Sequence, residues 1–505
     1  MKLTQQSLRI GAGRRSARLE ALCAVASPRL GIDLRALGAF RIALGLLVLV
    51  DLIGYRLPGL VPFYTDDGVF PRSALAEVYP PFASYSIHAA SGSARVQGLL
   101  FAIAACVAVC LLVGYRTRLS TGISLALLAS LHARNPHVVN GGDTILLSFL
   151  FLGLFVPLDA RWSLDSDRRP RDRDAGARRA CSIATATILL HVVIIYATNA
   201  VFKYQSDVWM SGAAVPRIFH VEEYIVLFGP SLAAYPTLLT AVNWLWIFLL
   251  TASACLILFA GRLRIALVAA FVGAHLGLAA TMRLGIFPFV MIAGLLLFLP
   301  PGVWNRAERL VRTGGTKWGF TFSTTSNPGD TERKPTSIAS AVTSPRVRRS
   351  ARAGRPAVLV CFLVAVLLWQ AMGVGFVDNP VPGLDDELTE ASWAFFAPNP
   401  PDSSSWYVVE AELESGETVD AIDGGDVTFD RPPDVAETYP TILWSQYGNE
   451  VRYADEAHYE PAAAYVCERA ASDTASVTIY HVEQSVDADG PVGDPVPHER
   501  IIYGC

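Results

Sequence analysis

The chain has 505 residues, 52% of them hydrophobic, and its mean hydropathy is +0.37. A soluble protein of this length rarely has so apolar a composition, so the sequence argues against an ordinary soluble protein and predicts a membrane protein. The net charge of −4 is small, and no nucleic-acid partner is predicted.

Apolar residues are clustered into long stretches with almost no charge. A helix that crosses the roughly 30 Å hydrocarbon layer needs about 20 such residues. The stretches that approach this length are Ala36–Leu57, Leu99–Val113, Ile183–Ala200, Leu238–Ala260, Ile265–Ala280, Ile286–Leu299 and Ala357–Val374. Two shorter segments, Leu119–Leu131 and Thr144–Leu158, flank Arg134–Asp143 and look like a helical hairpin. Together they predict an all-α polytopic bundle of about nine transmembrane helices in the lipid bilayer.

Charge is distributed unevenly along the chain. Phe376–Cys505 contains 27 Asp and Glu but only 4 Arg and no Lys, which leaves 18 acidic and 37 basic residues elsewhere. Loops rich in Lys and Arg mark the cytoplasmic side of a membrane. The basic segments fall at every second loop: Met1–Arg35, Tyr115–Arg118, Arg161–Arg179, Gly261–Arg264 and Trp304–Arg355. This pattern predicts a cell-membrane protein with a cytoplasmic N-terminus and an extracytoplasmic C-terminal domain.

The chain is expected to have five parts. They are a basic cytoplasmic arm (1–35), an eight-helix membrane core (36–303), a disordered cytoplasmic linker (304–355), a ninth transmembrane helix (356–376) and an acidic extracytoplasmic domain (377–505). The linker is rich in Ser, Thr, Pro, Gly and Arg, which is typical of disorder. Alternating stretches such as Ser405–Leu413 and Ser476–Glu483, with turn signals between them, predict a small, mostly β domain.

The acidic domain also carries information about its surroundings. Carboxylates hold hydration, and salt screens their repulsion, so a domain without Lys favours high external salt and a halophilic archaeon as the source. Ordinary solubility charge is the alternative. Cys467 and Cys505 are the only two cysteines of this domain, and a disulfide between them is compatible with an oxidising exterior. The chain has no Cys-X-X-Cys pattern, and no metal site is predicted.

Ionisable residues inside the membrane are costly, so each is a functional candidate. They are Arg41, Asp51, Asp143, His191, Lys203 and His275. Lys203 differs from the rest because the chain has only four lysines beside 37 arginines. An arginine stays protonated near neutral pH, whereas a lysine can lose its proton when it is desolvated. The alternative is a lysine that extends to the membrane surface.

Several other residues have both a structural and a functional interpretation. Tyr196, Asn199 and Lys203 are spaced i, i+3, i+7 and share one helix face. Asp143 is expected to cap the next helix, and Asn140 and His137 to line an outer pocket. His275 is either a packing residue or a site residue.

Two further expectations concern charged residues. Arg41 and Asp51, about 15 Å apart along a helix, are expected to find partners on other helices. Glu222 and Glu223 are expected to be solvated.

Taken together, these motifs resemble the HTTM (horizontally transferred transmembrane) domain of vitamin K-dependent γ-glutamyl carboxylases, over roughly residues 32–304. The matching motifs are Arg41–Gly45, Phe63–Arg72, Arg134–Asp143 with Trp162–Asp165, Tyr196–Lys203 with Trp209 and Gly212, and His275-Leu with Gly285–Phe289. Beyond them, Trp393–Pro400 resembles the start of the outer module of prokaryotic members.

The resemblance implies a chemistry and a site. In the carboxylases a lysine deprotonates vitamin K hydroquinone, and oxygen then gives a base strong enough to carboxylate peptide glutamate. It implies Lys203 as the base, helped by His275, with a reduced quinone of the vitamin K or menaquinone type held by Asn140, Tyr196, Asn199 and Trp209. A lysine base needs a neutral amine, which an apolar pocket favours. One position departs from the pattern, because Gly142 stands where the animal enzymes have a catalytic histidine.

Two hypotheses follow. The first is a quinol-dependent, carboxylase- or epoxidase-like membrane enzyme (a lyase) that uses Lys203. The second is a non-enzymatic membrane factor that helps an exported peptide or protein to mature, as in a related group that resembles the sporulation-delaying protein maturation factor. Epoxide formation would support the first, and a captured exported partner the second.

Overall fold

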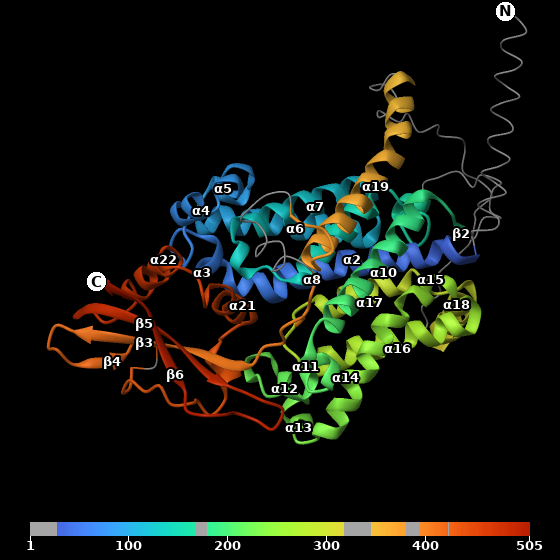
Figure 1. Cartoon of the computed structure of the whole chain (residues 1–505). Coiled ribbons are helices and arrows are strands. Elements are labelled where there is room, and N and C mark those ends of the chain that lie inside the picture. Colours follow the sequence, from blue (N-terminus) through green and yellow to red (C-terminus); the bar gives the residue numbers. More distant parts are fainter. Residues whose placement is uncertain (1–27, 168–178, 318–344, 380–392, 423) are drawn as a thin grey trace, which may run out of the picture.

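The computed structural model describes residues 28–167, 179–317, 345–379, 393–422 and 424–505. A bundle of helices occupies most of the molecule, and the C-terminal domain, which contains a β sheet, packs against one end of it (Figure 1). The cytoplasmic arm expected for residues 1–35 lies mostly outside the described residues. The chain is a multi-pass membrane protein, because several of its helices are long and apolar enough to cross a bilayer.

Six helices of the described chain meet that test of length and composition, and a seventh is added if one bent pair counts as a single span. The six are Leu34–Tyr64, α6 (Ala94–Val113), α10 (Ile183–Tyr204), Pro236–Leu258, α16 (Gly261–Thr281) and the Gly354–Gly373 part of α19 (Pro345–Gly373). The bent pair joins α17 (Phe287–Leu296) to the start of α18 (Pro301–Lys317) at 104°. The expected nine crossings are therefore not confirmed.

The first span changes its helix type along its length. It begins as α2 (Leu34–Leu49), continues as the π-helix η1 (Val50–Arg56) and the 3₁₀ turn η2 (Leu57–Gly59), and ends as α3 (Leu60–Tyr64). The fourth span likewise joins α14 (Pro236–Thr251), η6 (Ala252–Ala254) and α15 (Cys255–Leu258). Single π turns inside α-helices are frequent at functional sites.

The expected helical hairpin is present but is not among the six spans. It consists of α7 (Thr117–Arg134), the turn η4 (Pro136–Val138) and α8 (Gly141–Gly153). The helix α7 carries several buried polar side chains, Ser120, Thr121 and Ser124 among them, and α8 has only 13 residues. Polar content in one helix and short length in the other explain why hydropathy marks neither as a span.

Short elements connect the bundle. The short helices are α4 (Arg72–Val78), α5 (Pro80–Tyr85), η3 (His88–Ala90), α9 (Leu164–Asp167), α11 (Asp207–Ser211), α12 (Ala214–Ile218), η5 (Glu222–Tyr224) and α13 (Gly229–Ala233). The strands β1 (Ile32–Asp33) and β2 (Arg179–Ala180) pair antiparallel. Both ends of the segment expected as a disordered linker are helical, because α18 continues to Lys317 and α19 begins at Pro345. The middle of that segment lies outside the described residues.

The C-terminal domain has a four-stranded antiparallel sheet in the order β4-β3-β5-β6. Its strands are β3 (Ser403–Leu413), β4 (Thr418–Asp420), β5 (Thr474–Ser485) and β6 (Val496–Gly504). Both faces of β3 and β5 carry buried side chains: Trp406 and Val482 belong to one buried cluster, and Val409 and Ile479 to another. The domain also contains η8 (Val435–Thr438), α21 (Ile442–Val451) and α22 (Glu456–Cys467), which a mostly β domain did not lead us to expect.

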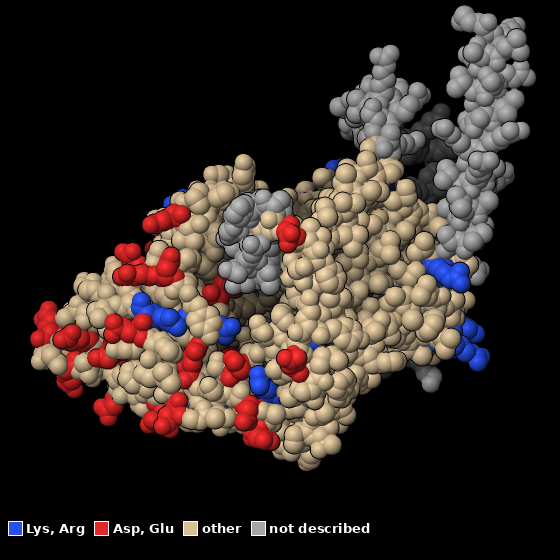
Figure 2. Space-filling model, viewed as in Figure 1, with Lys and Arg blue, Asp and Glu red and all other residues tan. Residues whose placement is uncertain are grey.

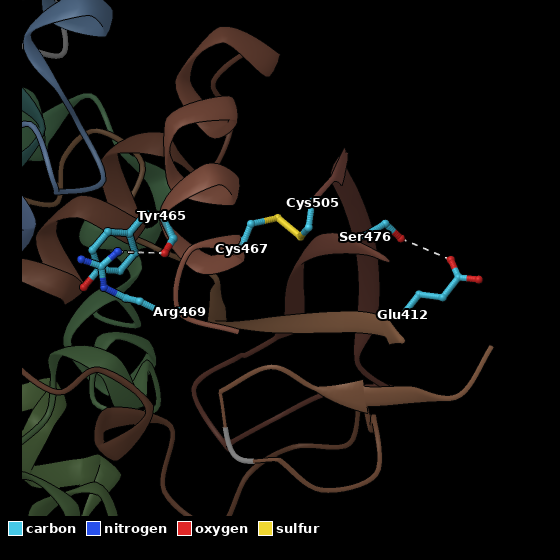
Figure 3. Close-up of a disulfide and its surroundings, with 6 residues drawn as sticks. All are labelled: Glu412, Tyr465, Cys467, Arg469, Ser476 and Cys505. Atoms are coloured by element: carbon cyan, nitrogen blue, oxygen red, sulfur yellow. Dashed lines mark hydrogen bonds between the residues drawn. A yellow bond between two sulfur atoms is a disulfide. The ribbon is translucent and has the colours of Figure 1, made fainter. Parts of the chain in front are cut away.

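A disulfide closes this domain. Cys467 at the end of α22 is bonded to Cys505, and their Cα atoms are 5.5 Å apart (Figure 3). Nearby, Ser476 Oγ on β5 donates a hydrogen bond to Glu412 on β3, at 3.2 Å. The disulfide ties Cys505, the last residue of the chain, to α22, the helix that contacts the bundle.

The domain is docked on the bundle through aromatic and backbone contacts. The rings of Phe63 and Trp444 lie 4.9 Å apart, edge to face. Arg469 also donates a hydrogen bond to the carbonyl of Asp67, at 3.0 Å. In the space-filling view, Asp and Glu gather over the C-terminal domain, while the visible face of the bundle is almost uncharged (Figure 2).

Candidate functional site

A cavity of about 670 Å³ lies between α10, α14 and α16, at the end of the bundle that contacts the C-terminal domain. Its wall is mostly made of Leu, Phe, Trp and Ala side chains. The polar or amphipathic residues on it are Asn140, Tyr196, Asn199, Lys203, Trp209, Tyr224, Thr281, Arg283 and Gln446. An apolar pocket of this size with a few convergent polar groups is typical of a small-molecule site.

One face of α10 supplies three of the predicted site residues. Tyr196, Asn199 and Lys203 all line the cavity, as their spacing of i, i+3, i+7 requires on an α-helix. Ser182 starts this helix with a capping box, in which its side chain accepts the N–H of Thr185. The other predicted members, Asn140 and Trp209, lie on the same wall. The structure therefore brings together five of the six residues expected at the site.

Lys203 is buried at the last turn of α10, with 1% of its surface exposed. Its amine donates a hydrogen bond to the carbonyl of Phe395, at 2.9 Å, and lies 3.8 Å from the centre of the Trp209 ring. In the described part of the chain no carboxylate forms an ion pair with it. The lysine is thus a cavity residue, not one that extends to the membrane surface.

Four consecutive carbonyls of the C-terminal domain cover this face of α10. Asn199 donates to Trp393, at 3.3 Å, and to Ala394. Trp209 Nε1 donates to the carbonyl of Phe396, at 2.7 Å, and Lys203 Nζ donates to the carbonyl of Phe395 between them. Phe395 and Phe396 also line the cavity, and we refer to residues 393–396 as the covering segment.

The covering segment holds an unusual backbone. Phe395 and Phe396 have φ angles of 43° and 60°, in the left-handed region. Bulky residues rarely adopt that region, and each such residue costs about 1–3 kcal/mol. The four hydrogen bonds from α10 and α11 and the tilted contact of the Phe395 ring with that of Phe287, at 4.6 Å, oppose that cost.

Two glycines make room for this packing. A Cβ at Gly141 would lie 2.4 Å from the Phe395 ring, and a Cβ at Gly142 would lie 2.8 Å from the Cα of Phe287. Asn140 caps α8, because its side-chain oxygen accepts hydrogen bonds from the backbone N–H groups of Gly142 and Asp143. In turn, the Asp143 carboxylate accepts a hydrogen bond from the backbone N–H of Asn140. The expected cap is thus a capping box in which Asn140 is the N-cap. A histidine at position 142 does not fit unless Phe287 moves.

Tyr196 lines the cavity, and His275 lies next to it. The Tyr196 ring stacks on Phe271 at 4.4 Å and lies 5.9 Å from the His275 ring. His275 Nδ1 bonds to the Phe271 carbonyl, at 2.8 Å. Tyr196 Oη and His275 Nε2 are buried without a hydrogen-bond partner among the described residues. His275 does not itself line the cavity, but its ring contacts three side chains that do, Tyr196, Trp246 and Phe287.

Asp51 does not find its partner on another helix, as was expected. Arg56 of the same span lies 2.7 Å from it and also binds Asp143, at 2.9 Å. The hydropathy pattern placed Arg56 inside the apolar stretch Ala36–Leu57, so Arg56 was not predicted as a partner of Asp51. Arg41 does bind other elements, through the carbonyls of Leu111, Leu112 and Trp162. The sequence signal that could have indicated the ion pair of Arg56 with Asp51 is a charged residue near the end of an apolar stretch, five positions after an Asp.

Glu223 is buried, so the expectation that it is solvated is wrong. Its Oε1 accepts a hydrogen bond from the Ser405 N–H, at 3.3 Å, where η5 meets β3. Burial raises the pKa of Glu223 from 4.5 to about 7, against the opposing effects of its hydrogen bonds and of Arg452. Glu222 is 40% exposed and pairs with Arg431 at 3.0 Å. The loop that looked solvated is covered by the C-terminal domain.

Two other candidates have structural surroundings. His137 packs its ring between Phe70 and Tyr447 and is absent from the cavity wall. His191 bonds to Ser148 Oγ, at 2.7 Å, and its ring lies 5.1 Å from that of Trp393.

Comparison with known proteins gives one match. The HTTM domain family matches residues 31–304, which is more than half of the chain, and this range contains the helices α10, α14 and α16 that enclose the cavity. No curated protein and no solved structure matches the chain. The chain belongs to the HTTM domain family.

Proposed function

We propose that this chain is a membrane enzyme that binds a reduced isoprenoid quinone in the cavity and uses Lys203 as its base. The observation that carries the proposal is the burial of a lysine amine on a mostly apolar wall, where no carboxylate of the described residues holds it in the charged form. We also propose the membrane orientation that the loop charges indicate, with the C-terminal domain outside.

The residues present fit a quinol. Tyr196 Oη is buried on the cavity wall with no partner in the described chain, so it is available to a ligand hydroxyl. Asn199, Lys203 and Trp209 lie at the end of the cavity covered by residues 393–396. The long apolar part, between α14 and α16, suits an isoprenoid tail. A quinol bound there would supply reducing power, since its reaction with oxygen yields one epoxide and one water.

The proposed role of Lys203 Nζ is to accept the proton of a quinol hydroxyl. The amine now bonds to the Phe395 carbonyl, and a lone pair that accepts a proton must point away from that carbonyl, into the cavity. The Trp209 ring also lies against the amine, with its centre 3.8 Å from Nζ. His275 is proposed to act through the side chains that it packs against, Tyr196 among them, because it does not itself line the cavity.

The test uses the full-length protein in detergent with menaquinol and oxygen, and measures quinone epoxide by mass spectrometry. Lys203→Ala is expected to lower the rate by about 100-fold or more, the usual contribution of a general base. Lys203→Arg keeps the charge and is expected to fail equally. Lys317→Ala is the matched control, since it removes another of the four lysines. Equal epoxide from wild type and Lys203→Ala would refute the proposal.

A second candidate function is a factor that helps an exported peptide to mature. The observation in its favour is that β6 is an edge strand whose residues are mostly exposed, and an extended peptide can add to such an edge. A photo-crosslinking residue at exposed Ile502 should capture the exported partner, whereas one at equally exposed Ile422 should not. Capture at both positions, or at neither, would count against it.

A further inference from the structure

Asp51, His132 and Asp143 come together at the end of the bundle that contacts the C-terminal domain. They belong to three elements, the π-helix η1, the last turn of α7 and the first turn of α8. One ligand atom from each residue lies within 4.8 Å of the other two, and all three residues are buried. The cluster adjoins the cavity wall without lining it, because the capping box joins Asp143 to Asn140, which lines the cavity.

Within this cluster, His132 is the residue whose hydrogen bonding is incomplete. It is 6% exposed, and neither ring nitrogen has a hydrogen-bond partner among the described residues. A neutral imidazole has one N–H and one lone pair, and buried groups of this kind are rarely left without partners. The Nε2 atom lies 3.9 Å from Asp143 Oδ1, which is too long for a hydrogen bond. Two atoms that each lie about 2.0–2.2 Å from one metal ion can have that separation.

Charge leads to the same conclusion. Arg56 is paired with both carboxylates, so the cluster of two Asp and one Arg keeps one negative charge. In the described chain no second Lys or Arg pairs with Asp51 or Asp143. A buried charge without compensation is strongly unfavourable. A divalent ion that carries one bound hydroxide would bring the total charge to zero.

Other occupants satisfy only half of these requirements. A water molecule gives His132 a partner but leaves the charge. A proton on His132 balances the charge but leaves a second N–H without an acceptor. A metal ion binds the lone pair of the imidazole and also neutralises the carboxylates, so that only one ring N–H remains for a water molecule to accept.

Arg56 suits an outer-shell role. It binds the Oδ2 atoms of Asp51 and Asp143, so each carboxylate is held in place while keeping a second oxygen. Carboxylates that ligate a metal are themselves usually held by such hydrogen bonds. One imidazole with two carboxylates suits a first-row divalent ion such as Zn²⁺ or Mn²⁺ better than Mg²⁺ or Ca²⁺, which prefer oxygen alone.

We propose that Asp51, His132 and Asp143 form a binding site for a first-row divalent metal ion. The sequence predicted no metal site because these residues are separated by about 80 and 10 positions and match no short motif. The proposal does not depend on the proposed reaction at Lys203, and its test measures binding only.

The experiment uses the full-length protein in detergent, treated with a chelator and then titrated with Zn²⁺. Bound metal is measured by mass spectrometry and affinity by competition with a dye. Wild type is expected to bind one Zn²⁺ tightly. His132→Ala is expected to weaken this binding at least tenfold, because even the loss of an outer partner costs roughly 10- to 100-fold. Asp51→Asn should also weaken it.

His498→Ala is the matched control, because it removes a half-exposed histidine from β6 and should bind Zn²⁺ as wild type does. His132 has no hydrogen-bond partner in the described chain, so its alanine variant is expected to remain folded, which gel filtration checks. Two results would overturn the proposal: a wild-type protein that takes up no Zn²⁺, or a His132→Ala variant with wild-type stoichiometry and affinity.

Discussion

Arg56 Nε lies 2.7 Å from Asp51 Oδ2, although five positions separate the two residues on one helix. In an α-helix, residues five apart point about 140° away from each other. The π-helix that spans Val50–Arg56 brings them onto one face, because its hydrogen bonds join residues five apart. The local change of helix type therefore creates this ion pair.

Removal of Arg56 should strongly destabilise the protein. Arg56, Asp51 and Asp143 are at most 3% exposed, so Arg56→Met leaves two buried carboxylates unpaired. The expected loss is about 3–5 kcal/mol. Arg72→Met is the control, because the Arg72–Asp66 pair is about 40% exposed and is expected to contribute no more than ~1 kcal/mol. Thermal unfolding in detergent measures both, and equal shifts would contradict the prediction.

A side chain at Gly142 should disturb the cavity wall. The Cβ of Gly142→Ala would approach the backbone of Phe287 within 2.8 Å, and backbone cannot move as a flexible side chain can. We expect a loss of about 1–3 kcal/mol, typical of overpacking. Gly273→Ala lies on the same cavity in an open position, where alanine favours the helix. Melting temperatures should fall for the first and not for the second. A Gly142→Ala variant that melts at the wild-type temperature would contradict the prediction and show that the backbone at Phe287 shifts to make room.

Burial of Glu223 should make stability depend on pH. Its pKa is about 7 in the folded chain and 4.5 as a free side chain. Between these values the unfolded chain loses the proton and the folded chain keeps it, so stability falls as pH rises from 4.5 to 7. Above pH 7 the penalty is complete, at roughly 3 kcal/mol.

Glu223→Gln should remove this dependence and raise the melting temperature at pH 8 relative to wild type. The variant keeps the shape of the side chain but has no charge to bury. Glu222→Gln, at a 40% exposed neighbour, serves as the control and should keep the wild-type pH profile. Melting curves between pH 4 and pH 8 provide the comparison. Parallel profiles of Glu223→Gln and wild type would exclude Glu223 as the cause.

The disulfide should contribute to the stability of the C-terminal domain. It joins residues 38 positions apart, and closing a loop of that length in the unfolded chain is worth about 4 kcal/mol in the chain-entropy model. The double variant Cys467→Ser, Cys505→Ser should melt at a lower temperature and lose its mobility shift on reduction. Cys361→Ser, at an exposed free cysteine, should behave as wild type. An unchanged melting temperature in the double variant would contradict this expectation.

The sequence predicted those features that depend on local periodicity. Hydropathy located most of the spans, and the spacing of Tyr196, Asn199 and Lys203 located one face of the cavity. The features it missed depend on distant contacts or on irregular backbone. Phe395 reaches Lys203 across 192 positions, and nothing local to either residue indicates that pairing. Glu223 looked solvated because its cover, β3, comes from another part of the chain.

The covering segment leads directly into the sheet of the C-terminal domain. Phe396 is separated from the first residue of β3, Ser403, by only six residues, while the Phe395 carbonyl holds the amine of Lys203. A pull on β3 away from the bundle would therefore be transmitted along a few backbone bonds to the buried amine. Strain in the left-handed backbone of Phe395 and Phe396 would be released once the four hydrogen bonds break. A displacement of the C-terminal domain would in this way change the contacts of Lys203 in the cavity.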